Sequence, residues 1–156
     1  MSDLLAVAIG IGLAVSLVFS ELFGLAAGGM VVPGYIALYL HRPLDVLLTL
    51  VAALVSYFIV YLLANVIIIY GKRRTVLMIL VGYLVRMLMD SFADGAVGNF
   101  GGLTSVEVSV IGYIIPGLVA IWIDRQGLAE TISTLLTASI VVRLLLILIF
   151  SSEFQL

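Results

Sequence analysis

Two arginines lie inside apolar stretches, where a charged side chain is costly and therefore informative. Arg86 lies in the run 75–90, and Asp90 follows it at i+4, a spacing that lets the two form an ion pair on one helix face. Arg143 lies deep in the run 128–150, with no acidic residue within one turn on either side. Because an ionised group in lipid must be paired or hydrated, Arg143 needs a distant acid, a water-filled cavity or an anionic ligand. A guanidinium also suits bidentate recognition of carboxylates, so both arginines are candidates for binding an anion. For Arg86 the alternative is a purely structural ion pair with Asp90.

The residue types of familiar catalytic sites are missing from the sequence. The chain has no Cys and one His, His41, so thiol chemistry and a Cys/His metal site are excluded, and no Ser/His/acid arrangement is recognisable. The glycine-rich stretch 95–102 is followed by Leu103-Thr104 rather than by the Lys and Ser/Thr of a phosphate-binding loop. We therefore predict no catalytic residue, no metal and no cofactor bound by this chain. Any nucleotide must be bound by a partner.

The composition identifies the solvent of the protein. Of 156 residues, 64% are apolar and 10% are charged. A soluble domain has roughly 45–50% apolar and about 25% charged residues, and a chain this small has no interior large enough to hide so much apolar surface. The lipid bilayer is therefore the solvent. A formal net charge of −2 offers too little basic surface for a nucleic-acid partner.

Long apolar runs predict an all-α integral membrane protein, because backbone groups in lipid must bond within their own segment. A closed barrel would need alternating strands, and the long runs do not alternate. The first run starts with Asp3 and no basic residue, which favours a retained helix over a signal peptide. We expect four long helices, at residues 4–20, 44–70, 75–90 and 128–150.

Two shorter apolar segments, residues 25–40 and 106–123, each carry Pro-Gly near the middle. Proline removes an amide donor and glycine loosens the next position, so each segment is predicted to be a short, kinked or broken span. A matched pair of broken helices is typical of a path near the membrane midplane, whereas a single Pro-Gly kink often only shapes packing. The candidates for such a path, or for packing, are Pro33, Gly34, Tyr35, Pro116, Gly117, Arg86, Arg143, Glu21 and Asp90.

The two Pro-Gly segments also resemble each other. Residues 29–42 align with residues 112–125 at a constant offset of 83, with the Pro-Gly pairs and the final arginines matched. The preceding helices end alike, since Glu21 matches Asp90 at an offset of 69, and the extra glycine-rich loop 93–105 accounts for the difference. This pattern predicts an internal duplication; chance alignment of apolar, Gly-rich sequence is the alternative.

The duplication defines the expected organisation. Residues 1–156 form one polytopic membrane domain, with a first repeat at 1–70 and a second at 75–156. If each Pro-Gly segment crosses the membrane, the repeats are inverted, and the positive-inside rule favours these six spans with both termini outside. If the segments instead dip in and return, the basic residues split almost evenly between the two sides. Small residues such as Gly10, Gly12, Gly28 and Gly29 would permit packing against partners or further copies in a homo-oligomer.

Five short motifs stand along the chain in a fixed order. They are Ser20-Glu21-Leu22-Phe23-Gly24, Gly29-Met30-Val31-Val32-Pro33-Gly34-Tyr35, Tyr70-Gly71-Lys72-Arg73-Arg74, Ile115-Pro116-Gly117-Leu118 and Arg125-Gln126-Gly127-Leu128. In order and spacing, over nearly the whole chain, this set resembles the CapC/PgsC family, the membrane subunit of bacterial poly-γ-glutamate synthase. One departure is Ser20, where the family has Thr, and the loop 94–104 fits the family pattern less well.

The resemblance implies a non-catalytic, multi-pass subunit of an ATP-dependent amide ligase complex in the bacterial inner membrane. A CapB/PgsB-like ligase subunit would bind ATP and Mg and extend the polymer, and a CapA/PgsA-like subunit would assist at the surface. This chain would anchor the ligase and support synthesis and translocation of poly-γ-glutamate, with Arg86, Arg143 and the Pro-Gly segments beside the passage. The candidates for facing the ligase or the polymer are Lys72, Arg73, Arg74, Arg125, Gln126 and Gly127.

Two other function classes remain open from the sequence. The same inverted halves suit an autonomous small transporter or channel that needs no synthase. The chain could also be a structural anchor that conducts nothing. The basic loop 71–74 has three interpretations as well: a docking point for a partner, a contact with membrane phospholipid, or only a topology signal.

Overall fold

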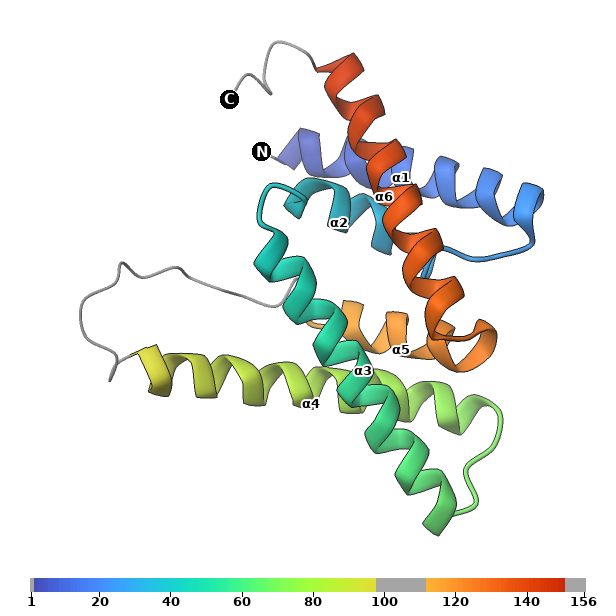
Figure 1. The fold of residues 1–156 in the computed structure, drawn as a ribbon, viewed down its shortest axis with the longest axis vertical. Coiled ribbons are helices and arrows are strands. Elements are labelled where there is room, and N and C mark those ends of the chain that lie inside the picture. Colours follow the sequence, from blue (N-terminus) through green and yellow to red (C-terminus); the bar gives the residue numbers. More distant parts are fainter. Residues whose placement is uncertain (1, 98–111, 151–156) are drawn as a thin grey trace. The chain divides into compact units, whose positions relative to one another are not determined.

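The computed structural model describes residues 2–97 and 112–150, and the regular elements in these ranges are all helices. In chain order they are α1 (Ser2–Phe23), α2 (Val32–Tyr39), α3 (Pro43–Val66), α4 (Lys72–Val97), α5 (Ile115–Gln126) and α6 (Leu128–Ile149) (Figure 1). Four of them, α1, α3, α4 and α6, contain spans of 21 to 24 residues that are long and apolar enough to cross a membrane. The predicted all-helical membrane fold with four long helices is confirmed.

The long helices differ from the predicted ranges mainly at their ends. α3 ends at Val66 rather than at residue 70, and Gly71 then adopts a φ of 64°, a left-handed conformation that favours glycine, before α4 begins. α4 continues through Val97, so the first residues of the loop expected at 93–105 are helical. The remainder of that loop lies outside the described residues.

In each Pro-Gly segment the Pro-Gly pair lies in the first turn of a short helix, rather than at a kink in the middle of a longer helix. α2 begins at Val32 and α5 at Ile115, each directly before its Pro-Gly pair. The first amides of a helix have no intrahelical partner, so proline costs no hydrogen bond there. With eight residues, α2 reaches only about 12 Å at 1.5 Å per residue and cannot cross a bilayer as a helix.

The first compact unit comprises Met1–Arg42 and Trp122–Leu156, and within it α1, α2 and α6 pack on one another. α1 and α2 approach closely at two glycines. A Cβ built on Gly12 would lie 2.7 Å from Gly34 Cα, and one built on Gly34 would lie 2.7 Å from the carbonyl oxygen of Ala8. No side chain fits at either position, so glycine is required for this helix crossing. One cluster of buried apolar residues in this unit comprises Ala8, Val15, Ala27, Ala37, Ala138, Val142 and Leu146.

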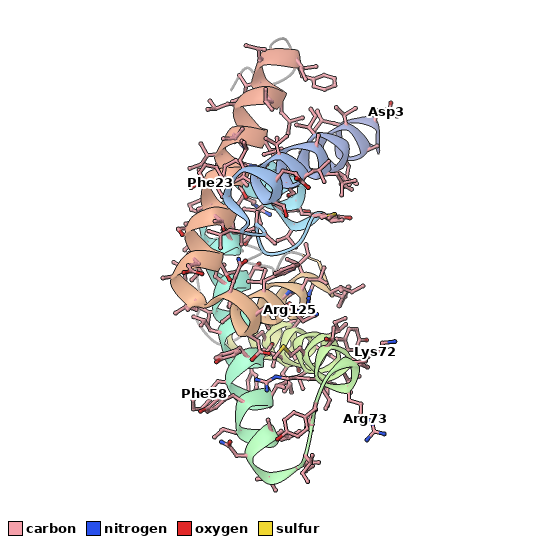
Figure 2. The ribbon with its side chains drawn as sticks, turned by 90° about the vertical axis from the view of Figure 1, so that its right-hand side faces the viewer. Asp3, Phe23, Phe58, Lys72, Arg73 and Arg125 are labelled. Atoms are coloured by element: carbon pink, nitrogen blue, oxygen red, sulfur yellow. The ribbon has the colours of Figure 1, made fainter. Side chains whose placement is uncertain are left out.

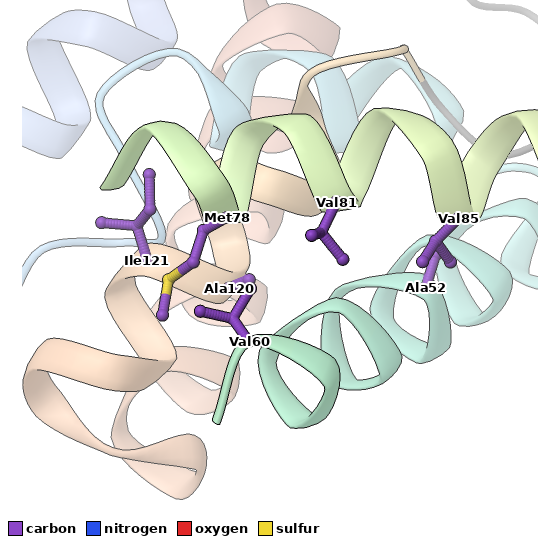
Figure 3. Close-up of a cluster of buried hydrophobic side chains, with 7 residues drawn as sticks. All are labelled: Ala52, Val60, Met78, Val81, Val85, Ala120 and Ile121. Carbon is purple, nitrogen blue, oxygen red and sulfur yellow. The ribbon is translucent and has the colours of Figure 1, made fainter. Parts of the chain in front are cut away.

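The second compact unit comprises Pro43–Ile121 and contains a crossing of the same kind. A Cβ built on Gly82 of α4 would lie 2.6 Å from the amide nitrogen of Gly117 in α5, and one built on Gly117 would lie 2.7 Å from Ile79 Cα. Figure 3 shows the buried side chains of α3, α4 and α5 that meet in this unit: Ala52, Val60, Met78, Val81, Val85, Ala120 and Ile121.

The first unit joins α6 to α1 and α2 at the other end of the sequence, whereas the second unit is the continuous stretch Pro43–Ile121. α3 packs with α4, and α6 packs with α1 and α2, so the last helix of each predicted repeat belongs to the unit that holds the first helix of the other. α3 and α6 nevertheless bury residues at the same spacing, with a constant offset of 86 between them. The buried residues are Asp45, Thr49, Ala52, Ala53, Ser56 and Val60 in α3, and Thr131, Leu135, Ala138, Ser139, Val142 and Leu146 in α6. The predicted repeats therefore differ from the compact units, and the duplication itself stays a prediction.

Gly12→Ala is expected to destabilise the first unit, because its Cβ would meet the backbone of Gly34. Overpacking of this kind costs about 1–3 kcal/mol, so the midpoint of thermal unfolding in detergent should fall, as followed by helical circular dichroism. Gly10→Ala is the matched control on the same helix, since its Cβ would meet no atom within 4 Å. It should keep or raise the midpoint, because Ala is the better helix former by about 1 kcal/mol. Equal midpoints for the two variants would contradict the crossing.

Candidate anion-binding and docking sites

Arg86 lies on α4 and is only 8% exposed. Its Nε donates to Asp90 Oδ2 at 3.1 Å, so the ion pair predicted from the i+4 spacing forms. The Asp90 side chain is 35% exposed, which places the carboxylate at the outer edge of the pair. The pair therefore joins a buried cation to a carboxylate that other molecules can approach.

Two tyrosines extend this pair into a cluster that the sequence interpretation missed. The Arg86 Cζ lies 3.9 Å from the ring centroid of Tyr113, close enough for a cation–π interaction. The Tyr113 ring lies 5.8 Å from the ring of Tyr83, which is on α4 like Arg86. Both rings are about half exposed. The available signal was the position of Tyr113 three residues before Pro116, but nothing in the sequence indicates that this position meets Arg86.

Arg143 binds a backbone carbonyl, a partner that the sequence interpretation did not consider. Its Nη1 donates to the carbonyl oxygen of Ala37 at 3.0 Å. Ala37 lies in the last turn of α2, where carbonyl oxygens accept no hydrogen bond from an amide of the same helix and where the helix dipole favours a cation. The next two carbonyls are also satisfied, because His41 Nδ1 binds Leu38 O and the Arg42 amide donates to Tyr39 O, both at 2.8 Å. Arg143 and His41 thus stabilise the end of α2.

The non-helical stretch before α2 is held by Gln126. The side-chain Oε1 of Gln126 accepts from the amide of Ala26 at 3.1 Å, and its Nε2 donates to the carbonyl of Ala26 at 2.5 Å. Gly28 and Gly29, both with positive φ, lie against Leu135 and Trp122. Irregular backbone at membrane depth needs such protein partners, because lipid offers none. Gln126, predicted as a docking residue, uses its amide inside the protein.

The remaining candidates divide by exposure. Pro33, Gly34, Pro116 and Gly117 are buried in the two helix crossings, which gives them a packing role, and Tyr35 is partly buried beside them. Glu21 is exposed near the end of α1. Gly127 adopts a φ of 101° between α5 and α6 and acts as a turn residue. Of the small residues considered for contacts with other copies, only Gly10 has open space above it, since Gly12, Gly28 and Gly29 contact the same unit.

The exposed cations lie at the ends of helices. Lys72 and Arg73 are exposed at the start of α4, and Figure 2 shows their side chains pointing away from the ribbon. Arg125 is exposed at the end of α5, with its Cζ 5.5 Å from the ring centroid of Trp122. Arg74 is partly buried and interacts within the protein. Within residues 2–97 and 112–150, no group of three His, Asp or Glu residues could hold a metal ion.

Comparison with known proteins finds matches over most of the chain. The family model described as Capsule biosynthesis CapC matches residues 11–132. The PGA biosynthesis protein CapC of Bacillus subtilis (strain 168) is 34% identical over 139 residues, which cover 86% of this chain and 88% of the relative. The Capsule biosynthesis protein CapC of Bacillus anthracis has the same identity and coverage. No solved structure matches the chain.

Gln126→Ala is expected to loosen the stretch before α2, because it removes the side-chain partner of the Ala26 amide and leaves the Ala26 carbonyl only the longer bond of 3.5 Å from Thr134 Oγ1. A polar group left unpaired away from water costs about 1–3 kcal/mol. Hydrogen–deuterium exchange of the peptide containing Ala26 should therefore accelerate, and Gln126→Glu, which retains an acceptor but no donor, should have an intermediate effect. Asn65→Ala removes an exposed amide from α3 and is the control. Unchanged exchange in Gln126→Ala would show that the bonds do not hold the segment.

Proposed function

The chain belongs to the CapC family of capsule biosynthesis proteins, and we propose that it is the membrane subunit of a poly-γ-glutamate synthase. In this role it anchors an ATP-dependent amide ligase and supports synthesis and translocation of the polymer. The observation that carries the proposal is the 34% identity to two CapC proteins over most of both chains, since one of them is named for PGA biosynthesis and the other for capsule biosynthesis. Four candidate membrane spans support a multi-pass membrane protein, and its place in the bacterial inner membrane is part of the proposal.

The chemistry of amide-bond formation belongs to a partner in this proposal. The chain has no Cys, and its one His binds the Leu38 carbonyl at the end of α2. ATP and Mg would therefore be bound by a CapB/PgsB-like ligase subunit, and a CapA/PgsA-like subunit would act at the outer surface. The exposed Lys72 and Arg73 provide a cationic surface for the ligase or for anionic phospholipid.

The passage for the polymer is proposed to involve the arginines within the spans. A polyanion requires compensating cations where water is scarce, and a guanidinium recognises carboxylates bidentately. The two glycine crossings, one in each compact unit, support an internal duplication. The inverted arrangement of the halves, as in transporters with paired broken helices, is part of the proposal. The Pro-Gly pairs shape these crossings and thereby hold α2 beside α1 and α5 beside α4.

Affinity purification of the tagged chain from its native cells in mild detergent is expected to recover an ATP-dependent ligase. The recovered complex should form polymer from glutamate when ATP and Mg are supplied, and ligase purified without this chain should not. Lys72→Glu/Arg73→Glu should weaken recovery of the ligase if the exposed cations are its docking point. A lone protein, purified from cells that express all neighbouring genes and inactive in the assay, would contradict the synthase role and favour an autonomous transporter.

The six-span arrangement is tested by cysteine labelling, because the chain has no Cys and each introduced thiol is unique. Tyr70→Cys and Leu128→Cys replace exposed residues before α4 and at the start of α6. Both should be labelled by a membrane-impermeant maleimide from the cytosolic side only. Leu44→Cys, at the start of α3, should be labelled from outside and controls for vesicle integrity. Labelling of Tyr70→Cys and Leu128→Cys from opposite sides would show that the second Pro-Gly segment is re-entrant.

A further inference from the structure

The two glycine crossings give a residue-by-residue correspondence between α1 and α4. Gly34 approaches the Ala8 carbonyl and Ile9, and Gly117 approaches the Met78 carbonyl and Ile79. α1 therefore corresponds to α4 at an offset of 70, and α2 corresponds to α5 at an offset of 83. This differs by one residue from the offset inferred from the helix ends. It matches Asp90 with Ser20 rather than with Glu21.

The charged cluster of α4 has no counterpart at the corresponding positions of the first unit. Arg86 corresponds to Ser16, Asp90 to Ser20, Tyr83 to Leu13 and Tyr113 to Met30. Ser16 and Arg86 are both buried, at 3% and 8% exposure, so the position lies inside each unit. Since the first unit forms the same helix crossing without these four side chains, the crossing does not require the cluster. A buried arginine is costly, and its presence in one unit alone therefore points to a role other than folding.

The geometry of the cluster suits a carboxylate that is exchanged. Asp90 binds the Nε edge of Arg86, and the Tyr113 ring covers the Arg86 guanidinium at 3.9 Å. A ligand carboxylate that replaces Asp90 would substitute one ion pair for another, so the buried cation would never be left uncompensated. The half-exposed rings of Tyr83 and Tyr113 and the partly exposed Asp90 form the accessible side of the cluster.

We propose that Arg86 and Asp90 form a carboxylate-exchange site in which Tyr113 positions the guanidinium while the ligand carboxylate replaces Asp90. The ligand class is an anion carrying carboxylates. Its identification as γ-linked glutamate rests on the proposed function. Free glutamate and the polymer share this chemistry, and repeated carboxylates favour the polymer because neighbouring groups rebind at high local concentration.

The test is binding of a γ-linked glutamate decamer to the purified full chain in detergent, measured by microscale thermophoresis, with free L-glutamate as the second probe. The variants introduce residues that the first unit carries at the corresponding positions. Arg86→Ser/Asp90→Ser should weaken decamer binding by about 100-fold, as expected when a buried charge partner is removed. Tyr113→Met should weaken it by about 10-fold through loss of the cation–π contact, and Tyr113→Phe should restore it.

Tyr70→Met is the matched control, because Tyr70 is 78% exposed and lies outside the cluster. It should bind the decamer like the unmodified chain, and all variants should retain the thermal unfolding midpoint if the cluster serves binding rather than folding. Tighter binding of free L-glutamate than of the decamer would identify the monomer as the ligand. Decamer binding unchanged in Arg86→Ser/Asp90→Ser, or absent in the unmodified chain, would overturn the site. If the site is overturned but the purified complex still makes polymer, the proposed function is retained. If the purified complex makes no polymer, the proposed function is overturned whatever the binding result.

Discussion

Backbone groups in lipid find no partner in the solvent, and the structure of this protein depends on how the interrupted segment around α2 satisfies them. The stretch before α2 is bonded by the side-chain amide of Gln126, and the last turn of α2 by Arg143 and His41. These side chains do for the irregular backbone what regular helix bonds do elsewhere. Gln126, Arg143 and His41 therefore make the interrupted segment around α2 possible.

The same constraint explains the glycines at the helix crossings. A short helix of eight or twelve residues has little surface of its own to bury, so it gains stability from close approach to a long neighbour. Gly12 with Gly34, and Gly82 with Gly117, bring the two backbones nearer than any side chain would permit. Buried hydroxyls on the long helices, such as those of Thr49 and Ser139, donate to carbonyls one turn earlier in their own helix. These hydroxyls therefore need no partner on a neighbouring helix.

The two arginines within the spans differ in what they do. Arg143 completes the hydrogen bonding of α2 and is explained by the fold. Arg86 is held by a carboxylate and an aromatic ring at positions where the other unit carries Ser20 and Met30. The polymer of the proposed function is anionic, and this asymmetry fits it because a fixed cation within a membrane unit is suited to a carboxylate ligand.

The sequence by itself determined the solvent, the four long helices, the break at each Pro-Gly pair, the Arg86–Asp90 ion pair and the resemblance to the CapC family. These features depend on local chemistry: apolar run length, the missing amide of proline and an i+4 spacing on one helix. Tertiary structure decided the rest. It placed Pro33 and Pro116 in the first turns of short helices, paired Gln126 with Ala26, gave Arg143 the Ala37 carbonyl and brought Tyr113 to Arg86. It also grouped α3 with α4 and α6 with α1 and α2. The contacts of Gln126, Arg143 and α6 join segments far apart in the chain, and apolar helices of similar composition carry no pattern that specifies which of them will pack together.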